Sequence, residues 1–144
     1  MQTVHDLLKS KGRVVWTINP DTSVSEALKL MSEKNLGALI VTDASLHVEG
    51  IFSERDFVRK FLAHEKNFLN LKVKDFMTDK VICVTPDRSV QECLASMTDK
   101  HIRHLPVLEN DQLIGLISIG DLVKAVIAGQ EFTIEQLNNY ITTG

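Results

Sequence analysis

Two short stretches of the chain place an aspartate three residues after a serine: S-E-R-D from Ser53 and S-I-G-D from Ser118. Apolar residues at helical spacing follow each stretch, so the serine fits the N-cap of a helix and the aspartate its first turn. Free N–H groups at such an N-terminus, with a serine hydroxyl beside them, can bind phosphate. An acid in this place can also accept hydrogen bonds from the hydroxyls of a ribose. Asp56 and Asp121 are therefore candidates for nucleotide contact, and helix capping alone is the structural alternative.

Basic side chains accompany the two stretches at different places. Arg55 directly precedes Asp56, where its guanidinium could contact phosphate oxygens through two hydrogen bonds, whereas the second stretch has Gly120 there. Arg103 and His104 precede the second stretch, in I-R-H-L-P-V, and we expect them at the mouth of a second cleft. Two clefts with cations in different places need not bind the same ligand. A solvated surface position is the alternative for each of these side chains.

Most of the chain consists of two copies of one pattern. P-D-T-S-V-S-E-A-L-K-L-M-S-E-K from Pro20 returns as P-D-R-S-V-Q-E-C-L-A-S-M-T-D-K from Pro86. Further on, G-I-F-S-E-R-D-F-V from Gly50 returns as G-L-I-S-I-G-D-L-V from Gly115. A repeated unit of this kind is one supersecondary structure that buries its apolar face against its neighbour. The two candidate stretches thus occupy equivalent places in two copies of one unit.

Each copy predicts the same order of elements. An extended run ends at a proline, which cannot donate to a β-ladder. A serine with a glutamate three residues later then forms a capping box before apolar residues at i, i+3, i+4 and i+7, which predicts a helix. Two strand-like runs around a polar turn predict a hairpin, and a second helix closes the unit. The predicted elements are a strand at 14–18, a helix behind Ser23, strands at 38–42 and 48–52 and a helix behind Ser53, then a strand at 81–85, a helix behind Ser89, strands at 104–108 and 113–117 and a helix behind Ser118.

This order of elements predicts an α/β fold. The hairpin in each repeat gives the fold some α+β character. Each β-α-β-β-α repeat covers one sheet face with helices and leaves the other face bare. Two repeats packed through their bare faces form one module with pseudo-two-fold symmetry and two equivalent clefts. A lead-in, V-H-D-L-L from Val4 and V-K-D-F-M from Val73, precedes each repeat. The predicted divisions are repeat 1 with its N-terminal lead-in at 1–66, repeat 2 at 67–129 and a C-terminal amphipathic helix at 130–144.

Two segments have no counterpart in the other copy. The basic run K-S-K-G-R from Lys9 is interpreted as a solvated loop, with a cover over a phosphate as the alternative. T-I-E-Q from Thr133 predicts a capping box for the C-terminal helix, and Leu137 and Ile141 follow on the face of Ile134. This helix could pack on its own module or on a second chain, and we expect it to contribute a dimer contact.

These motifs resemble a known family. An opening strand that ends at a proline, a capped helix, the motif h-P-V and then G-h-h-S-x-x-D, in two copies and in this order, are similar to the tandem CBS domain pair, or Bateman module. The resemblance extends from Thr3 to Gly129 and is closest to short stand-alone prokaryotic CBS-pair proteins. It implies adenosine-bearing ligands, such as AMP, ADP, ATP, NAD(H) or S-adenosylmethionine, in the clefts between the repeats. It also implies that two CBS pairs associate into a disc-shaped homodimer.

The resemblance implies a ribose-binding role for Asp56 and Asp121. It places the adenine in an apolar slot along the opening strands, where backbone groups contact the base, and core packing is the alternative for those residues. The candidate ligand-binding residues are Ser53, Arg55, Asp56, Arg103, His104, Ser118, Asp121, Thr17, Ile18, Val84 and Thr85.

Several classes of function are disfavoured. The net charge of −3 gives no basic footprint for nucleic acid. No apolar stretch reaches the ~20 residues of a membrane span, and the N-terminus lacks the apolar core of a signal peptide. We therefore expect a cytoplasmic protein without membrane contact. Cys83 and Cys93 fit small buried hydrophobes, and His101 and His104 have no third ligand nearby in the sequence, so no metal site is predicted.

The chain carries none of the common catalytic motifs. We expect a non-catalytic regulatory module that senses an adenine nucleotide (AMP, ATP or NAD(H)), acts in signal transduction or energy sensing, uses no catalytic cofactor and forms a homodimer. The alternative is a scaffold or regulatory subunit that acts mainly through contacts with an unidentified protein target. An apolar patch that stays exposed after dimerisation would favour this alternative, and Trp16 and the C-terminal helix are the candidates for it.

Overall fold

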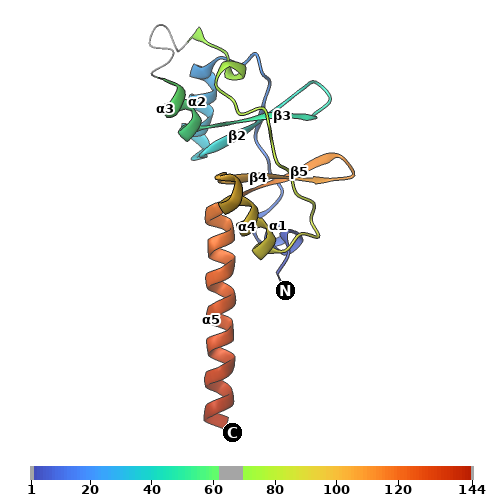
Figure 1. Ribbon diagram of the computed structural model, residues 1–144, viewed down its shortest axis with the longest axis vertical. Helices are drawn as coiled ribbons and strands as arrows, with labels where there is room; N and C mark the ends of the chain where they lie inside the picture. Colours follow the sequence, from blue (N-terminus) through green and yellow to red (C-terminus); the bar gives the residue numbers. More distant parts are fainter. Residues whose placement is uncertain (1, 62–69, 144) are drawn as a thin grey trace.

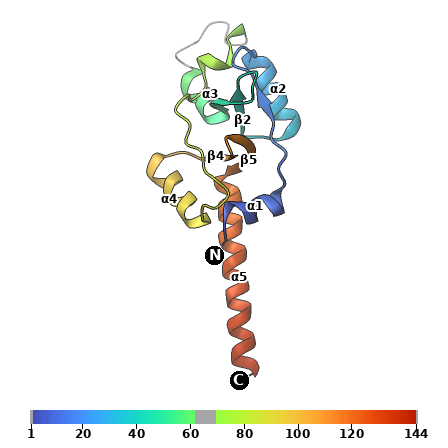
Figure 2. The same ribbon diagram turned by 90° about the vertical axis from the view of Figure 1, so that its right-hand side faces the viewer.

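The computed structural model describes residues 2–61 and 70–143, which form a body of sheets and helices from which the last helix projects (Figure 1 and Figure 2). The elements follow the predicted order of two repeats. They are α1 (Val4–Lys11), β1 (Thr17–Ile18), α2 (Val24–Lys34), β2 (Ala38–Thr42), β3 (Val48–Ser53), α3 (Glu54–Phe61), the 3-10 helix η3 (Val73–Asp75), α4 (Val90–Lys100), β4 (His104–Glu109), β5 (Gln112–Ser118) and α5 (Ile119–Thr143).

The two repeats build two sheets. In the first, β1 pairs in parallel with β2, and β2 pairs antiparallel with β3. In the second, β4 pairs antiparallel with β5, and Val84 forms a single parallel bridge to Val107 in place of the strand predicted at 81–85. The strand predicted at 14–18 is likewise reduced to β1. Both opening strands are shorter than predicted because the residues before them leave the edge of the sheet, and in the second repeat those residues line a pocket instead.

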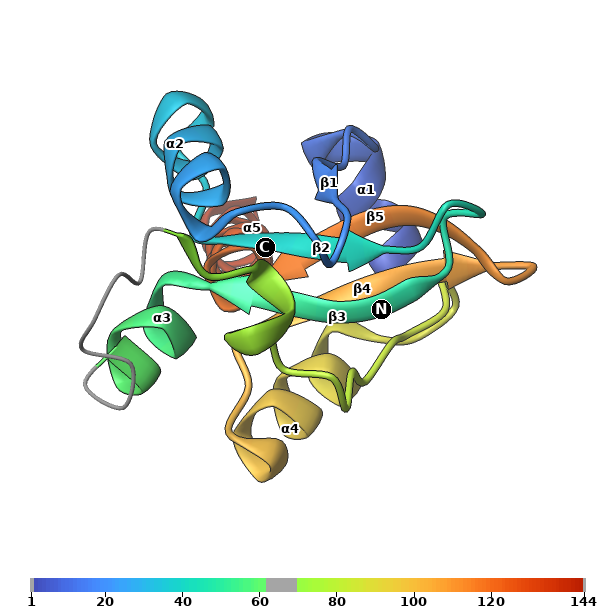
Figure 3. The same ribbon diagram turned by 90° about the horizontal axis from the view of Figure 1, so that it is seen from above.

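The two sheets lie one above the other between the helices (Figure 3). Leu39 and Val41 of β2 belong to the core beneath α2, whereas Ile40 points to the opposite face because side chains alternate along a strand. Ile40 is nevertheless fully buried. The face of the first sheet that its own helices leave bare is therefore covered by the second repeat, as predicted for two repeats packed through their bare faces.

A serine N-cap and a left-handed C-cap bound the helix that follows each opening strand. The hydroxyl of the predicted serine cap accepts a hydrogen bond from the N–H three residues later, at 3.1 Å in α2 and 3.0 Å in α4. Of these two helices only α4 has the complete capping box that was predicted for both, with the Ser89 N–H donating to the Glu92 carboxylate at 3.3 Å. At the other end, Asn35 and His101 adopt the left-handed conformation with φ of 55°. Such a C-cap turns the chain sharply out of the helix. In the second repeat this turn leads directly to Arg103 and His104.

Each lead-in packs in the core of the other repeat. Val4 and Leu8 belong to the cluster formed with α4, β4 and β5, and the Val4 N–H donates to the carbonyl oxygen of Arg88 at 2.8 Å. The second lead-in is exchanged in the same way. Val73 belongs to the cluster formed with α2, β2 and β3, and its N–H donates to the carbonyl oxygen of Thr22 at 2.8 Å.

The predicted division keeps the N-terminal lead-in with repeat 1 at 1–66, and the exchange adds that its apolar side chains are buried in the core of the second repeat. The sequence places each lead-in beside the repeat that follows it, but the apolar residues of the lead-in are buried across the symmetry axis. Separation of the repeats would therefore expose apolar side chains of both cores. The predicted boundary between residues 66 and 67 lies outside the described residues.

A glycine lies where each exchanged lead-in crosses a strand. A Cβ atom on Gly50 would lie 2.6 Å from Met77 Sδ and 2.9 Å from the carbonyl oxygen of Thr78. A Cβ atom on Gly115 would lie 2.7 Å from Leu8 Cδ2. The two glycines that recur in the repeat pattern therefore permit close approach of the lead-in, because any side chain at either position would overlap with it.

The last helix, α5, runs unbroken through the predicted start of a separate C-terminal helix. Thr133 is not an N-cap there, because its hydroxyl donates to the carbonyl oxygen of Gly129 four residues earlier, at 2.9 Å. The prediction of a separate helix was wrong because a capping-box pattern is local and nothing before it stops the preceding helix. A single glycine is tolerated inside a helix and does not end it.

Gly50→Ala should destabilise the fold more than Gly115→Ala. The new Cβ at position 50 meets a backbone carbonyl, whereas at position 115 it meets the flexible end of Leu8. We expect Gly50→Ala to lower the free energy of unfolding by about 1–3 kcal/mol and Gly115→Ala by less. Urea denaturation followed by the fluorescence of Trp16 measures both values. Equal losses would contradict the close approach of the Thr78 backbone.

Candidate functional site

A pocket of about 390 Å³ lies between the two repeats. Its walls come from the start of α3, from the segment that leads out of η3 and from the loop between α4 and β4. The predicted ligand-binding residues in these walls are Ser53, Arg55, Asp56, Arg103 and His104. Residues that are far apart in the sequence are thus brought together in one concave site, which is the usual form of a small-molecule site.

The first S-x-x-D pair caps α3 and also lines the pocket. The Asp56 N–H donates to the Ser53 hydroxyl at 3.1 Å, so the capping role is present. One carboxylate oxygen of Asp56 accepts a hydrogen bond from the Thr78 hydroxyl at 2.9 Å, which ties α3 to the segment that enters the second repeat. The wall therefore offers a helix N-terminus, a hydroxyl and a carboxylate, which are groups that phosphate and ribose can use.

Basic side chains from both repeats line the same pocket. Arg55 and Arg59 lie one turn apart on α3, and Arg103 and Lys80 come from the second repeat. The positive charges of Arg59 and Arg103 lower the pKa of the Arg55 guanidinium, because each like charge disfavours the others. A bound anion would relieve this repulsion. The pocket is therefore electrostatically suited to phosphate.

Arg103 and His104 line this pocket together with Arg55 and Asp56. His104 also pairs with Ser118 across β4 and β5, and the charges of Lys11 and Asp121 act on its imidazole, so its assignment to the second cleft stays a prediction. Arg103 and His104 were assigned to the second cleft because they precede the second S-x-x-D stretch along the chain. The loop that carries them instead faces α3 of the first repeat. Burial lowers the pKa of His104, with a further contribution from nearby positive charge, so its imidazole is neutral at pH 7.

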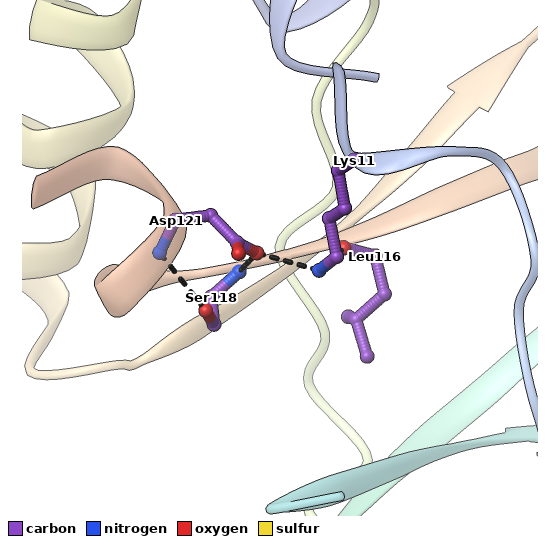
Figure 4. Close-up of polar contacts among 4 residues, drawn as sticks. All are labelled: Lys11, Leu116, Ser118 and Asp121. Carbon is purple, nitrogen blue, oxygen red and sulfur yellow. Dashed lines mark hydrogen bonds and ion pairs between the residues drawn. The ribbon is translucent and has the colours of Figure 1, made fainter. Parts of the chain in front are cut away.

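The second S-x-x-D pair already holds a cation of the same chain. The Asp121 N–H donates to the Ser118 hydroxyl at 3.1 Å, and the Ser118 N–H donates to an Asp121 carboxylate oxygen at 2.8 Å. The same oxygen lies 2.5 Å from Lys11 Nζ, which also donates to the carbonyl oxygen of Leu116 at 2.6 Å (Figure 4). Burial alone would raise the pKa of Asp121, but the hydrogen bonds from Lys11 and Ser118 bring it below its ordinary value.

The basic run from Lys9 is therefore only partly a loop. All five residues of the run are exposed, as predicted, but the expected loop is wrong for its first half, because α1 continues through Lys11 and ends at Gly12, whose φ of 97° favours glycine. The end of this helix directs Lys11 to β5 and to Asp121. Lys11 thus occupies the acceptor that the family resemblance assigns to a ribose.

The residues predicted for the adenine slot do not line the pocket between the repeats. Thr17 and Ile18 line a separate, open hollow of about 520 Å³ beside α2. Val84 packs against the core of the second repeat, and the Thr85 hydroxyl donates to the carboxylate of Asp87. The opening strands are short and end within their own repeat, so it is the segment before Val84 that reaches the pocket.

Several pocket residues were missed by the sequence analysis. Arg59 could have been found, because it lies four residues after Arg55 and so on the same face of a helix. Thr78 and Lys80 stand in a polar stretch after the second lead-in, and only the exchange of lead-ins brings that stretch to α3. The apolar part of the lining includes Ile82, which was assigned to the opening strand.

Lys11→Met should remove an interaction that depends on pH. The pKa of Asp121 is lowered in the folded chain, so its ionised form stabilises the fold above the unfolded pKa, and this contribution is lost as the pH falls through the folded pKa. We expect the variant to be less stable by about 0.5–1 kcal/mol at pH 7, a small value because the pair is partly exposed. The difference should shrink below about pH 4 in urea denaturation. A difference that persists in acid would show that Lys11 acts through packing alone.

Known proteins resemble this chain over nearly its whole length. The mitochondrial CBS domain-containing protein CBSX3 of Arabidopsis thaliana is 38% identical over 151 aligned residues, which cover 99% of this chain and 73% of the relative. A solved protein with CBS domains from Burkholderia ambifaria, described as a candidate signal-transduction protein, is 47% identical with a TM-score of 0.84. This match covers 90% of this chain and 96% of that chain.

Two findings bear on the cellular location. Across residues 2–61 and 70–143, no helix combines the length and the apolar character that a membrane crossing requires. The Arabidopsis relative is mitochondrial, so the expectation of a cytoplasmic protein stays a prediction.

The family itself is established by sequence and by fold. The model of the CBS domain matches residues 3–63 and again residues 73–128, so both repeats are recognised separately. The solved CBS domain pair of a further protein, in complex with 5′-methylthioadenosine and S-adenosyl-L-methionine, is 23% identical with a TM-score of 0.77 over 90% of this chain and 98% of that chain. At this identity the likeness shows the fold alone. The chain belongs to the CBS domain family, as a tandem pair of CBS repeats that forms one regulatory module.

Proposed function

We propose that this CBS pair is a non-catalytic sensor that binds an adenine nucleotide (AMP, ATP or NAD(H)) in the pocket between its repeats. The observation that carries the proposal is the meeting of the Asp56 carboxylate with arginines of both repeats in one pocket. A carboxylate beside several cations suits a ligand that has both hydroxyl groups and a phosphate.

Each part of the ligand has a proposed partner. The ribose hydroxyls donate to Asp56, and they replace or share the hydrogen bond from Thr78. The phosphate binds at the N-terminus of α3, near Arg55 and Arg103. The base lies against the apolar lining that Ile82 contributes. Thr17, Ile18, Val84 and Thr85, which the sequence analysis assigned to the base, lie outside this pocket, so we leave them out of the proposed contacts.

Regulation follows from the position of the pocket. Its walls belong to both repeats, so a ligand that contacts Asp56 and Arg103 bridges them. Arg59 and Arg103 each repel Arg55, and an anion bound among them reduces that repulsion. Ligand binding can therefore favour an arrangement in which the two repeats lie closer together, to the extent that the ligand binds that arrangement more tightly.

The second S-x-x-D pair is proposed as a weaker site. A ribose at Asp121 has to displace Lys11, whose ammonium is held by the carboxylate and by the carbonyl oxygen of Leu116. At Asp56 the ligand displaces only a neutral hydroxyl. A charge-assisted hydrogen bond is the stronger of the two kinds, so the sites differ although their motifs match. We expect one tightly bound nucleotide per chain.

Asp56→Ala should weaken nucleotide binding, whereas Asp121→Ala is the matched control and should not. The loss of the ribose acceptor is expected to raise the Kd for the tightest of AMP, ATP and NAD(H) by about 10- to 100-fold. Titration calorimetry measures the affinity and the stoichiometry, and urea denaturation shows that both variants are folded. Equal affinity in Asp56→Ala and the native chain would reject the assignment, as would a larger loss in Asp121→Ala.

Arg103→Ala should weaken the binding of AMP more than that of adenosine. The arginine is proposed to contact the phosphate, which adenosine lacks, so its removal is expected to cost AMP about 10-fold in affinity and adenosine little. Calorimetric titration of the native chain and the variant with both ligands gives the comparison. Losses of the same size for AMP and adenosine would place Arg103 elsewhere in the site.

The alternative function, a scaffold that acts mainly through protein contacts, is supported by one observation. The part of α5 that projects from the body carries exposed apolar side chains, including Phe132 and Tyr140. These side chains lie far from the pocket along the helix. The two functions are therefore compatible, with a sensor in the body and a contact surface on the helix.

A further inference from the structure

The projecting helix carries a regular apolar pattern that the body does not cover. Its spacing alternates between four and three residues over the whole exposed length of α5. We call this row the α5 seam, and it consists of Val123, Ile127, Gln130, Ile134, Leu137 and Ile141. The apolar members are between 44% and 73% exposed. A 4-3 spacing of apolar residues is the heptad pattern of a coiled coil.

The body covers a different side of this helix. Leu122 and Ala125 are the buried residues of α5 and belong to the core of the second repeat. Residues 130–141 are exposed at every position, and Figure 1 and Figure 2 both show this part of α5 extending away from the body. This segment continues a helix that is already anchored on the body, but its side chains are exposed, and most helical stability in proteins comes from the packing of an apolar face. A partner on the exposed part of α5 would supply that packing.

The residue types along the seam specify what that partner is. The isoleucines at 127, 134 and 141 fall at position a of the heptad, and Leu137 falls at position d. Isoleucine at a with leucine at d favours two parallel strands. Gln130 falls at position d, where a polar side chain in each of two identical helices can hydrogen-bond across the interface and fix the register. A second copy of this chain brings an identical seam in that register.

The flanking positions agree with this partner and disfavour a lipid surface. In a parallel pair, the residues beside the seam that face each other are Val126 with Glu131 and Thr133 with Asn138, which brings no like charges together. A helix that binds a membrane surface carries lysine and arginine on its polar face. The charged residues of the projecting stretch 130–141 are instead the acids Glu131 and Glu135.

We propose that the α5 seam pairs with the α5 seam of a second copy of this chain, as a parallel two-stranded coiled coil that joins two CBS pairs. This inference is independent of the proposed nucleotide site, because the seam and the pocket share no residue. It names a surface and an orientation for the homodimer that the family resemblance implies.

Disulfide trapping tests the orientation. In full-length chains, Leu137→Cys places two cysteines opposite each other in a parallel pair, whereas Phe132→Cys places them on the far side of each helix. We expect Leu137→Cys to form a covalent dimer about tenfold faster than Phe132→Cys under mild oxidation. The native chain is the blank for Cys83 and Cys93. Equal rates for the two variants, or no dimer above the blank, would overturn the parallel seam.

Sedimentation equilibrium tests the seam without cysteines. Ile134→Asp should raise the dissociation constant of the pair at least about 100-fold, because each dimer loses two isoleucines from its core. Phe132→Asp, which changes a residue of similar exposure outside the seam, should leave it unchanged. Ile134→Asp should also bind AMP as the native chain does, so a failure here is distinct from a failure of the nucleotide site. An unchanged association in Ile134→Asp, or the same loss in Phe132→Asp, would reject the proposal.

Discussion

The burial of each lead-in in the opposite repeat is the interaction on which the rest of the structure depends. Val4 and Leu8 complete the core of the second repeat, and Val73 and Phe76 complete the core of the first. Neither repeat has a closed core without the chain segment that belongs, by sequence, to the other. The two crossings hold the repeats in one relative position, and that position brings the segment after η3 against α3.

The pocket is a direct result of this arrangement. Asp56 stands at the start of α3 in the first repeat, and Arg103 stands before β4 in the second, so they meet only because the repeats are held face to face. The same symmetry should give two equal sites, but the first lead-in continues into a helical turn that ends at Lys11. An ammonium reaches Asp121, whereas a threonine hydroxyl reaches Asp56. Asp56 is thereby left with a neutral partner, and Asp121 is held by an internal cation.

Local sequence patterns predicted the elements well, and the arrangement of the elements less well. The capping serines, the helices behind them and the two hairpins follow from periodicity and turn chemistry, which act over a few residues. The exchange of lead-ins was not predicted. The apolar residues in V-H-D-L-L indicate that the segment is buried, but they do not indicate which repeat it packs against. The continuous α5 was missed for the related reason that a local cap at Thr133 cannot show whether the preceding helix has ended.

The candidate site shows the same division. Ser53, Arg55 and Asp56 were predicted together because they are adjacent at one helix N-terminus, and the structure places all three in the wall of one pocket. Arg103 was assigned to the second cleft, and the structure places it near Arg55, because its position depends on how the repeats face each other. Lys11 and Asp121 are 110 positions apart in the sequence, so no local pattern could predict their contact.

The central claim is that an adenine nucleotide binds between the repeats at Asp56. The most direct test is an NMR titration of the ¹⁵N-labelled chain with AMP, and then with ATP and NAD(H). The account predicts that the amide shifts concentrate in three separate segments: 53–56, 78–82 and 101–104, which meet only in the pocket. Shifts confined to Ser118 and Asp121, or no shifts with any of the three nucleotides in a folded chain, would contradict it.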